Sequence, residues 1–150
     1  MHEEPRYFES FELGERRTTL SRTITETDFV VHAGHSGDFF PHHMDEEFCK
    51  TQPFGKRIAH GTMTFAIGIG LTATIINPHA MTYGYERLRF PNPVFIGNTI
   101  HTEIEISRVL DDPKRPAFGQ VIESCSVKNQ KNETVLFCEH ILLVKKQGSH

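Results

Sequence analysis

The sequence has no tryptophan and only three cysteines. Cys49, Cys125 and Cys138 are odd in number and form no Cys-x-x-Cys pair, so neither a disulfide framework nor a zinc ribbon is predicted. The simplest setting for such a chain is the reducing cytoplasm, and we expect the three thiols to be packing residues.

Charge of one sign is not in excess either. The net charge is −3, with 16 basic and 19 acidic residues spread along the chain, so no basic face for nucleic acid is indicated. The N-terminus lacks a basic segment followed by an apolar one, and we expect no secretory signal. The uncharged run from Ile58 to Ala80 has the length of a membrane span. Glycines, threonines and histidines dilute it and no aromatic and basic anchors flank it, so we expect no membrane segment.

A chain of 150 residues is long enough for one domain with a buried core. Residues 1–13 are polar with interspersed aromatic side chains, which predicts a loosely packed arm before the first strand. Residues 147–150 read Gln-Gly-Ser-His and look like the remnant of a cloning tag. The expected single domain therefore covers residues 1–146.

Two short helices are predicted before residue 51. The first has Thr25 or Thr27 as its N-cap and ends at Gly34 or Gly37. Its expected apolar face consists of Phe29, Val30 and Ala33. The second spans residues 45–50 and has acidic residues at its start and a lysine at its end, which suits the helix dipole.

A longer helix is predicted from about Gly61 to Ile76. Apolar side chains occur on every side of it, the pattern of a helix buried all round, and Asn77-Pro78 stops it. Strands are then predicted at 81–90, 99–106, 118–127 and 135–144, with an earlier one at 18–24. An antiparallel sheet of this kind can bury the long helix by curling round it, which predicts the α+β class.

The stretch from Ser36 to Thr62 carries the chemistry. Asp38 precedes His43 by five residues, and Pro41 stiffens the connection. A carboxylate and an imidazole from one loop can supply a proton acceptor and a proton donor. An ordinary polar loop fits the same spacing, so the residues alone leave both interpretations open.

Ser36-Gly-Asp-Phe-Phe-Pro-His-His-Met-Asp45, together with Pro53-Phe-Gly55 and Ile58-Ala-His-Gly61, resembles the MaoC-like dehydratases, which include the (R)-specific enoyl-CoA hydratases. The resemblance covers about residues 18–145. It implies the hotdog fold, in which a curved antiparallel sheet wraps round one long central helix. It also implies catalytic roles for Asp38 and His43, with the Gly61 amide as donor to the thioester carbonyl. No cofactor is implied, because the coenzyme A thioester is the substrate.

This chemistry has a physical rationale. Adding water to a double bond conjugated to a thioester requires a base, an acid and a donor for the enolate-like oxygen. The amide of Gly61 in the first turn of the helix suits the last role, since the helix dipole favours negative charge there, and glycine permits close approach of a ligand. The residues leave the assignment of base and acid between Asp38 and His43 open.

Four further residues are candidates for substrate binding. Phe40 stands where the family usually has asparagine, and His42 is a second departure. His60 is expected at the helix entrance, hydrogen-bonded to backbone. Arg87 and Arg89 lie one strand period apart and should share a face, which is either solvated or meets a phosphate of coenzyme A.

The sequence also suggests a metal site and other functions. His32, His35, His42 and His43 invite a metal site, but their spacing matches no structural zinc pattern and we expect no metal. A hotdog thioesterase and a non-catalytic acyl-CoA-binding module are the alternative functions. We expect a homodimer, because pairing two sheets edge to edge removes exposed strand edges.

Overall fold

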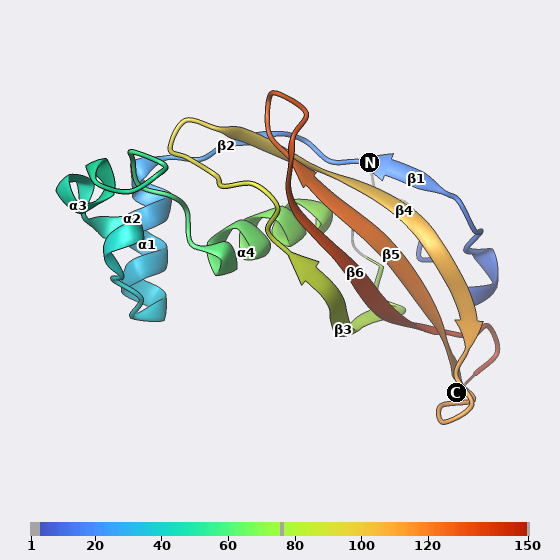
Figure 1. Ribbon diagram of the computed structural model, residues 1–150. Helices are drawn as coiled ribbons and strands as arrows, with labels where there is room; N and C mark the ends of the chain where they lie inside the picture. Colours follow the sequence, from blue (N-terminus) through green and yellow to red (C-terminus); the bar gives the residue numbers. More distant parts are fainter. Residues whose placement is uncertain (1–3, 76, 150) are drawn as a thin grey trace.

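A computed structural model describes residues 4–75 and 77–149. Its main feature is a six-stranded antiparallel sheet that curves round one helix (Figure 1). The strands are β1 (Arg16–Thr18), β2 (Arg22–Thr23), β3 (Ala80–Arg89), β4 (Thr99–Asp111), β5 (Phe118–Lys128) and β6 (Thr134–Lys145). The helices are η1 (Phe8–Ser10), α1 (Glu26–Ser36), α2 (Pro41–Met44), α3 (Glu46–Lys50) and α4 (Gly61–Thr72). The predicted α+β class and the wrapped helix are confirmed.

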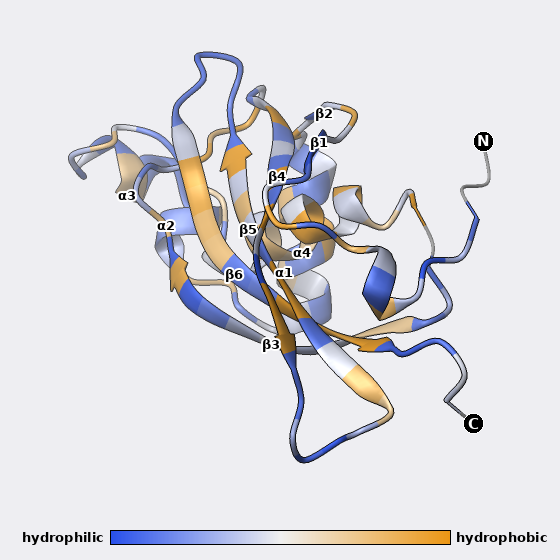
Figure 2. Cartoon of the chain, turned by 90° about the vertical axis from the view of Figure 1, so that its right-hand side faces the viewer, coloured by the Kyte–Doolittle hydropathy of each residue, from blue (hydrophilic) through white to orange (hydrophobic). Residues whose placement is uncertain are grey.

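The sheet has the order β1-β4-β5-β6-β3, and β2 pairs with another part of β4. The predicted alternation in β4 is confirmed, since Ile100, Ile104 and Ile106 are buried. They are part of the apolar surface that faces α4 and the N-terminal arm. Figure 2 shows hydrophobic stretches along the strands and in α4, whereas the loops that join β4 to β5 and β5 to β6 are hydrophilic.

Helix α4 packs closely on the sheet because a glycine faces it. A Cβ on Gly68 would lie 2.5 Å from a methyl group of Val127, and the Thr102 hydroxyl donates to the Gly68 carbonyl at 2.7 Å. The prediction that the helix is buried all round is wrong: Thr62, Ala66 and Gly70 form an exposed stripe at a spacing of four residues. Within the described residues, no helix is long and apolar enough to cross a membrane.

The helix is also shorter than predicted. It ends at Thr72, whose hydroxyl bonds back to the Ile69 carbonyl, and the amide of Ala73 bonds to the Gly70 carbonyl in a tightened last turn. Such bonds satisfy the last carbonyls before Asn77 and Pro78 are reached. Ile76, the predicted end, lies outside the described residues.

The predicted first strand, at 18–24, is two short strands. Between them the amide of Thr102 on β4 bonds to the side-chain hydroxyl of Thr19 at 2.9 Å, where a regular ladder would use a backbone carbonyl. Leu20 beside it is 78% exposed. A threonine side chain thus competes with the ladder and interrupts the strand.

The N-terminal arm packs more firmly than predicted. Phe8 and Phe11 belong to a second apolar cluster with Ile106, Val121 and Val144. The ring of Phe8 lies so close to Gly119 that a Cβ there would be 2.2 Å away. Aromatic side chains have enough area to hold a short polar arm on the sheet.

Helices α1 to α3 cover the entrance to α4. Thr25 caps α1 through a capping box with Asp28, and Gly37 ends it in the left-handed conformation at φ 78°. Phe29 and Ala33 are buried as predicted, but Val30 is 50% exposed, because it lies on the side of α1 away from the core.

Strand β3 does not keep a simple two-residue period. Its register with β6 shifts between Glu86 and Arg89, and Arg87 has a φ of 53°, in the left-handed region. A bulge of this kind re-aims side chains. The shared face predicted for Arg87 and Arg89 therefore has no basis in the strand geometry.

Candidate active site

Asp38 is positioned by the end of α1. Gly37 turns the chain, and the Asp38 amide donates to the Ser36 hydroxyl at 3.1 Å. The Asp38 carboxylate accepts the amide of Phe40 at 3.1 Å through Oδ1. One carboxylate oxygen therefore fixes the turn, and the other has no described hydrogen bond and is available for chemistry.

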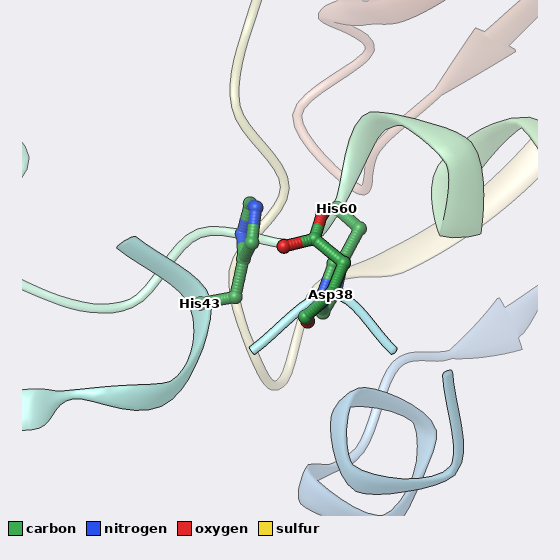
Figure 3. A group of neighbouring side chains, drawn as sticks. All are labelled: Asp38, His43 and His60. Atoms are coloured by element: carbon green, nitrogen blue, oxygen red, sulfur yellow. The ribbon is translucent and has the colours of Figure 1, made fainter. Parts of the chain in front are cut away.

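His43 lies on α2, directly across from Asp38 (Figure 3). Its Nδ1 is 2.7 Å from the carbonyl oxygen of Ile58. A carbonyl only accepts, so Nδ1 carries the proton and Nε2 of the neutral ring is the acceptor. Burial lowers the pKa of His43, and the neighbouring His60 and His42 lower it further against the opposing effects of the Ile58 carbonyl and Asp38. At neutral pH His43 therefore presents a basic nitrogen.

His60 completes the cluster from the residue before α4. It is only 1% exposed, and its Nε2 is 2.8 Å from the Asp38 carbonyl oxygen. Its ring stacks on that of His43, with centroids 3.9 Å apart and planes inclined by 26°. The expected bond from His60 to backbone is confirmed. Because it is buried, His60 contacts the Asp38 loop, whereas the sequence predicts a contact with substrate.

Gly61 begins α4, and no side chain caps the helix there within the described residues. The first amides of α4 therefore keep free donor capacity next to the cluster. A Cβ on Gly61 would lie 3.0–3.2 Å from the ring of Phe90, so the space expected for close approach of a ligand is partly taken by that ring. A cavity of about 470 Å³ adjoins His43, Gly61 and Phe90, with Thr64, Val94 and Val135 in its wall.

The three side chains lie close enough together to be candidate metal ligands. One ligand atom from each of Asp38, His43 and His60 lies within 4.8 Å of the others. The two imidazoles are stacked, however, and their lone pairs lie in nearly parallel planes. Two such lone pairs do not converge on one ion about 2 Å from each nitrogen. The arrangement suits proton transfer better than metal binding.

Phe40 joins this cluster only through its backbone, because its amide bonds to Asp38 and its carbonyl accepts the amide of His43. Phe40 is 56% exposed and its ring stacks on His42 at 4.9 Å. The two predicted arginines are not brought to the cluster by any described contact. Arg87 forms an ion pair with Glu139 at 3.4 Å, and Arg89 bonds to the Leu88 carbonyl.

Sequence reasoning missed Phe90, which lies 29 positions after Gly61 and meets it only through the fold. It also missed His32, whose Nε2 is 2.8 Å from the Thr62 hydroxyl and whose ring lies 4.8 Å from that of His60. Burial lowers the pKa of His32, with a further contribution from His60. The cluster of histidines was noticed in the sequence, but which of them meet was not readable.

The family described as MaoC like domain matches residues 10–127. The 3-hydroxybutyryl-CoA dehydratase of Methylorubrum extorquens is 31% identical over 94% of this chain and 85% of its own length. Protein MaoC of Klebsiella aerogenes is 37% identical over 72% of this chain, and the chain spans only 32% of that protein.

Two solved structures are similar to this chain over nearly its whole length. An Archaeoglobus protein described as a monoamine oxidase regulatory protein has a TM-score of 0.90 and 37% identity, and covers 98% of this chain and 99% of its own. A Mycobacterium tuberculosis protein described as a double hotdog fold has a TM-score of 0.82 at 16% identity, over 97% of this chain and 46% of its own. The second likeness shows the fold alone, and it confirms the predicted hotdog fold.

Proposed function

The chain belongs to the MaoC-like domain family, and from this premise we propose that it reversibly adds water to a trans-2-enoyl-CoA thioester, giving a 3-hydroxyacyl-CoA. The observation that carries the proposal is the pair of free acceptors, the Asp38 carboxylate and Nε2 of His43, on opposite sides of one small space. The (R) configuration of the product is part of the proposal and is supported by the resemblance.

In this reaction one water molecule is held between Asp38 and His43. Both groups accept hydrogen bonds, so the water presents its oxygen lone pair to the β-carbon of the enoyl group. One acceptor takes a proton as the carbon–oxygen bond forms. The resulting conjugate acid delivers a proton to the α-carbon, which leaves the two side chains in their starting states. The neutral ring of His43 suits the role of base, and Asp38 helps to orient the water.

Charge that develops on the thioester oxygen is assigned to the amide of Gly61. The free donors and the positive dipole of the first turn of α4 favour an oxyanion there. One such donor is worth roughly 3 kcal/mol of transition-state stabilisation. The ring of Phe90 lies 3.0–3.2 Å from the place of a Cβ on Gly61, so it bounds the space beside the start of α4.

The proposal also covers the coenzyme A part of the substrate and the assembly of the chain. Coenzyme A is bound as part of the substrate, and no metal or prosthetic group takes part in the chemistry. Arg89 immediately precedes Phe90 at the rim of the cavity, so it is a candidate for a coenzyme A phosphate; Arg87 is weaker, since Glu139 already pairs with it. We retain the homodimer, because β3 at the sheet edge exposes Met81 and Tyr83. A cytoplasmic location is retained with it.

Two alternatives make different predictions. A thioesterase would use a carboxylate to activate water against the thioester carbonyl and would release free coenzyme A thiol, whereas a histidine paired with that carboxylate favours hydration. A non-catalytic binding module would hold acyl-CoA without turnover, and Asp38→Ala would leave its affinity unchanged.

The deciding experiment follows the ultraviolet absorbance of the conjugated thioester when the protein meets crotonyl-CoA, with Asp38→Asn and His43→Ala in parallel. We expect loss of absorbance with the natural chain and a rate lower by roughly a hundredfold or more in each variant. Unchanged absorbance across a panel of branched and carboxylated enoyl-CoAs would refute hydration. Thiol release, measured with a chromogenic disulfide, would identify the thioesterase.

A further inference from the structure

The cavity of about 470 Å³ beside His43 contains one buried polar side chain that the proposed mechanism does not use. Most of the cavity wall is apolar and includes Phe54, Ile58, Phe90, Val94 and Val135. Thr64 of α4 also lies in this wall, and only 3% of its surface is exposed. A hydroxyl in such surroundings needs a hydrogen-bond partner, because burying it without one is costly.

The hydroxyl of Thr64 has no partner among the described residues. Two other threonines of the same helix differ from it. The Thr72 hydroxyl donates to the Ile69 carbonyl at 2.7 Å. The Thr62 hydroxyl pairs with Nε2 of His32 at 2.8 Å. A threonine inside a helix commonly bonds back to a carbonyl of the preceding turn, and Thr64 forms no such bond. Its hydroxyl therefore keeps its capacity to donate.

This hydroxyl opens into the cavity. Within the described part of the chain, the fully enclosed side-chain polar atoms without a partner are Nδ1 of His60 and Nδ1 of His140. The oxygen of Thr64 is not one of them, so it keeps some surface that a ligand atom can reach. Because Thr64 forms part of the wall of this cavity, that surface faces the space beside His43.

The amide of Gly61 is a second free donor in the same wall. It begins α4 and has no acceptor among the described residues. Gly61 and Thr64 are three positions apart, so they lie on one face of the helix, where the Cβ positions of such residues are about 5–6 Å apart. Two donors that share one oxygen at about 2.9 Å each are separated by at most about 5.8 Å. The spacing therefore allows one ligand oxygen to accept from both.

The chemistry of the wall decides which ligand oxygen fits. The neutral ring of His43 presents an acceptor, since its Nδ1 proton is used by the Ile58 carbonyl. Asn92 also lines the cavity, but it is exposed and its amide group donates to the Thr134 carbonyl at 2.8 Å. The buried wall thus offers two donors in apolar surroundings at the positive end of the α4 dipole. Such a place favours an oxygen on which negative charge develops, and oxyanion holes are commonly built from more than one donor.

We propose that the Thr64 hydroxyl is the second donor of an oxyanion hole, in which it binds the thioester oxygen of the substrate together with the amide of Gly61. The inference rests on the proposed hydration and adds a catalytic residue to it. As water adds to the β-carbon, the electrons of the double bond move toward the thioester oxygen, and both hydrogen bonds strengthen. Delivery of a proton to the α-carbon returns this charge, and both donors keep their hydrogens throughout.

Thr64→Val tests this role, since valine has nearly the shape of threonine but lacks the hydroxyl. We expect kcat for crotonyl-CoA to fall by roughly 10- to 100-fold with little change in KM, because the lost hydrogen bond is strongest in the transition state. Thr64→Ser keeps the hydroxyl and should retain most of the activity. An unchanged kcat in Thr64→Val would overturn the proposal.

Thr72→Val is the matched control in the same helix. It removes a hydroxyl that bonds to the Ile69 carbonyl at the other end of α4. Its kcat should be unchanged, whereas its midpoint in urea unfolding should fall, since a formed hydrogen bond is lost. Thr64→Val should keep or raise the midpoint, because it removes an unpaired hydroxyl from apolar surroundings. A lowered midpoint in Thr64→Val with an unchanged kcat would assign Thr64 a structural role.

Acetoacetyl-CoA separates this inference from the hydration, because it has no double bond to which water could add. Its enolate places negative charge on the thioester oxygen and is distinguished from the keto form by its ultraviolet absorbance. We expect the natural chain to bind it with a larger enolate fraction than in water at the same pH. In Thr64→Val the ratio of enolate to keto form should fall by about tenfold.

The outcomes distinguish the two proposals. A bound enolate that depends on Thr64, without hydration of crotonyl-CoA, would support the oxyanion hole and refute the proposed function. Hydration of crotonyl-CoA with the same kcat and the same enolate fraction in Thr64→Val would leave the proposed function standing and refute this inference. A lower kcat in Thr64→Val with an unchanged enolate fraction would also refute it, since Thr64 would then act on the attacking water.

Discussion

The ring of His60 stacks on that of His43 at 3.9 Å while its Nε2 lies 2.8 Å from the Asp38 carbonyl oxygen. A carbonyl accepts, so His60 donates through Nε2. One buried side chain therefore touches both members of the proposed catalytic pair and fixes their separation. His60 is a positioning residue, since it acts through Asp38 and His43.

His60→Phe should preserve the stacking and lose the hydrogen bond. We expect kcat for crotonyl-CoA to fall about tenfold with little change in KM, because the bond holds the Asp38 loop in place. His60→Gln keeps a donor at a similar reach and should recover most of the loss. An unchanged kcat in His60→Phe would show that the Asp38 loop holds itself.

The pH profile of kcat/KM should report His43. Burial, with His60 and His42, holds its pKa below the usual value of about 6.5, against the opposing effects of the Ile58 carbonyl and Asp38. The basic form is then the major form at pH 7, and activity should fall as the pH drops through a midpoint below about 6.5. Asp38→Asn removes a charge that raises this pKa, so the midpoint of its residual activity should move to lower pH. A midpoint above 6.5 would contradict the role of His43 as base.

Two glycines of α4 should respond oppositely to alanine. Gly68→Ala places a Cβ 2.5 Å from Val127, whereas Gly70→Ala meets nothing within 4 Å. Overpacking should lower the free energy of unfolding by about 1–3 kcal/mol at position 68. The higher helix propensity of alanine should raise it by up to about 1 kcal/mol at position 70. Urea unfolding measures both, and equal effects would mean that the helix does not approach β5 as described.

Arg57 should stabilise the cover of the site. Its side chain is 13% exposed and bonds to Glu26 of α1 and Glu46 of α3, the latter at 3.0 Å. Both carboxylates are half exposed, so solvent weakens the pairs, and we expect Arg57→Met to cost about 1–2 kcal/mol of unfolding free energy. Lys50→Ala removes an exposed pair with Glu47 and should cost less than about 0.5 kcal/mol. A difference that persists undiminished in high salt would argue against an electrostatic origin.

The sequence by itself determined the features that depend on neighbours along the chain. The two-residue period placed the start of β4, turn signals placed β5 and β6 to within one residue, and the candidate caps Thr25 and Gly37 placed α1, because these signals act over one helical turn or one strand. The short spacing also placed Asp38 and His43 in one loop. Their roles remain proposals, but their proximity needed no distant contact.

Only the tertiary structure decided what depends on segments far apart in sequence. His60 bonds to Asp38, which is 22 positions away in the sequence. Arg17 of β1 meets Glu123 of β5 across 106 positions, because β4 pairs with both strands. The exposed stripe of α4 exists because the sheet covers the Gly68 side of the helix and leaves the Gly70 side open. Hydrophobic composition alone showed no such side, since burial is set by what packs against a residue and local pattern does not contain that information.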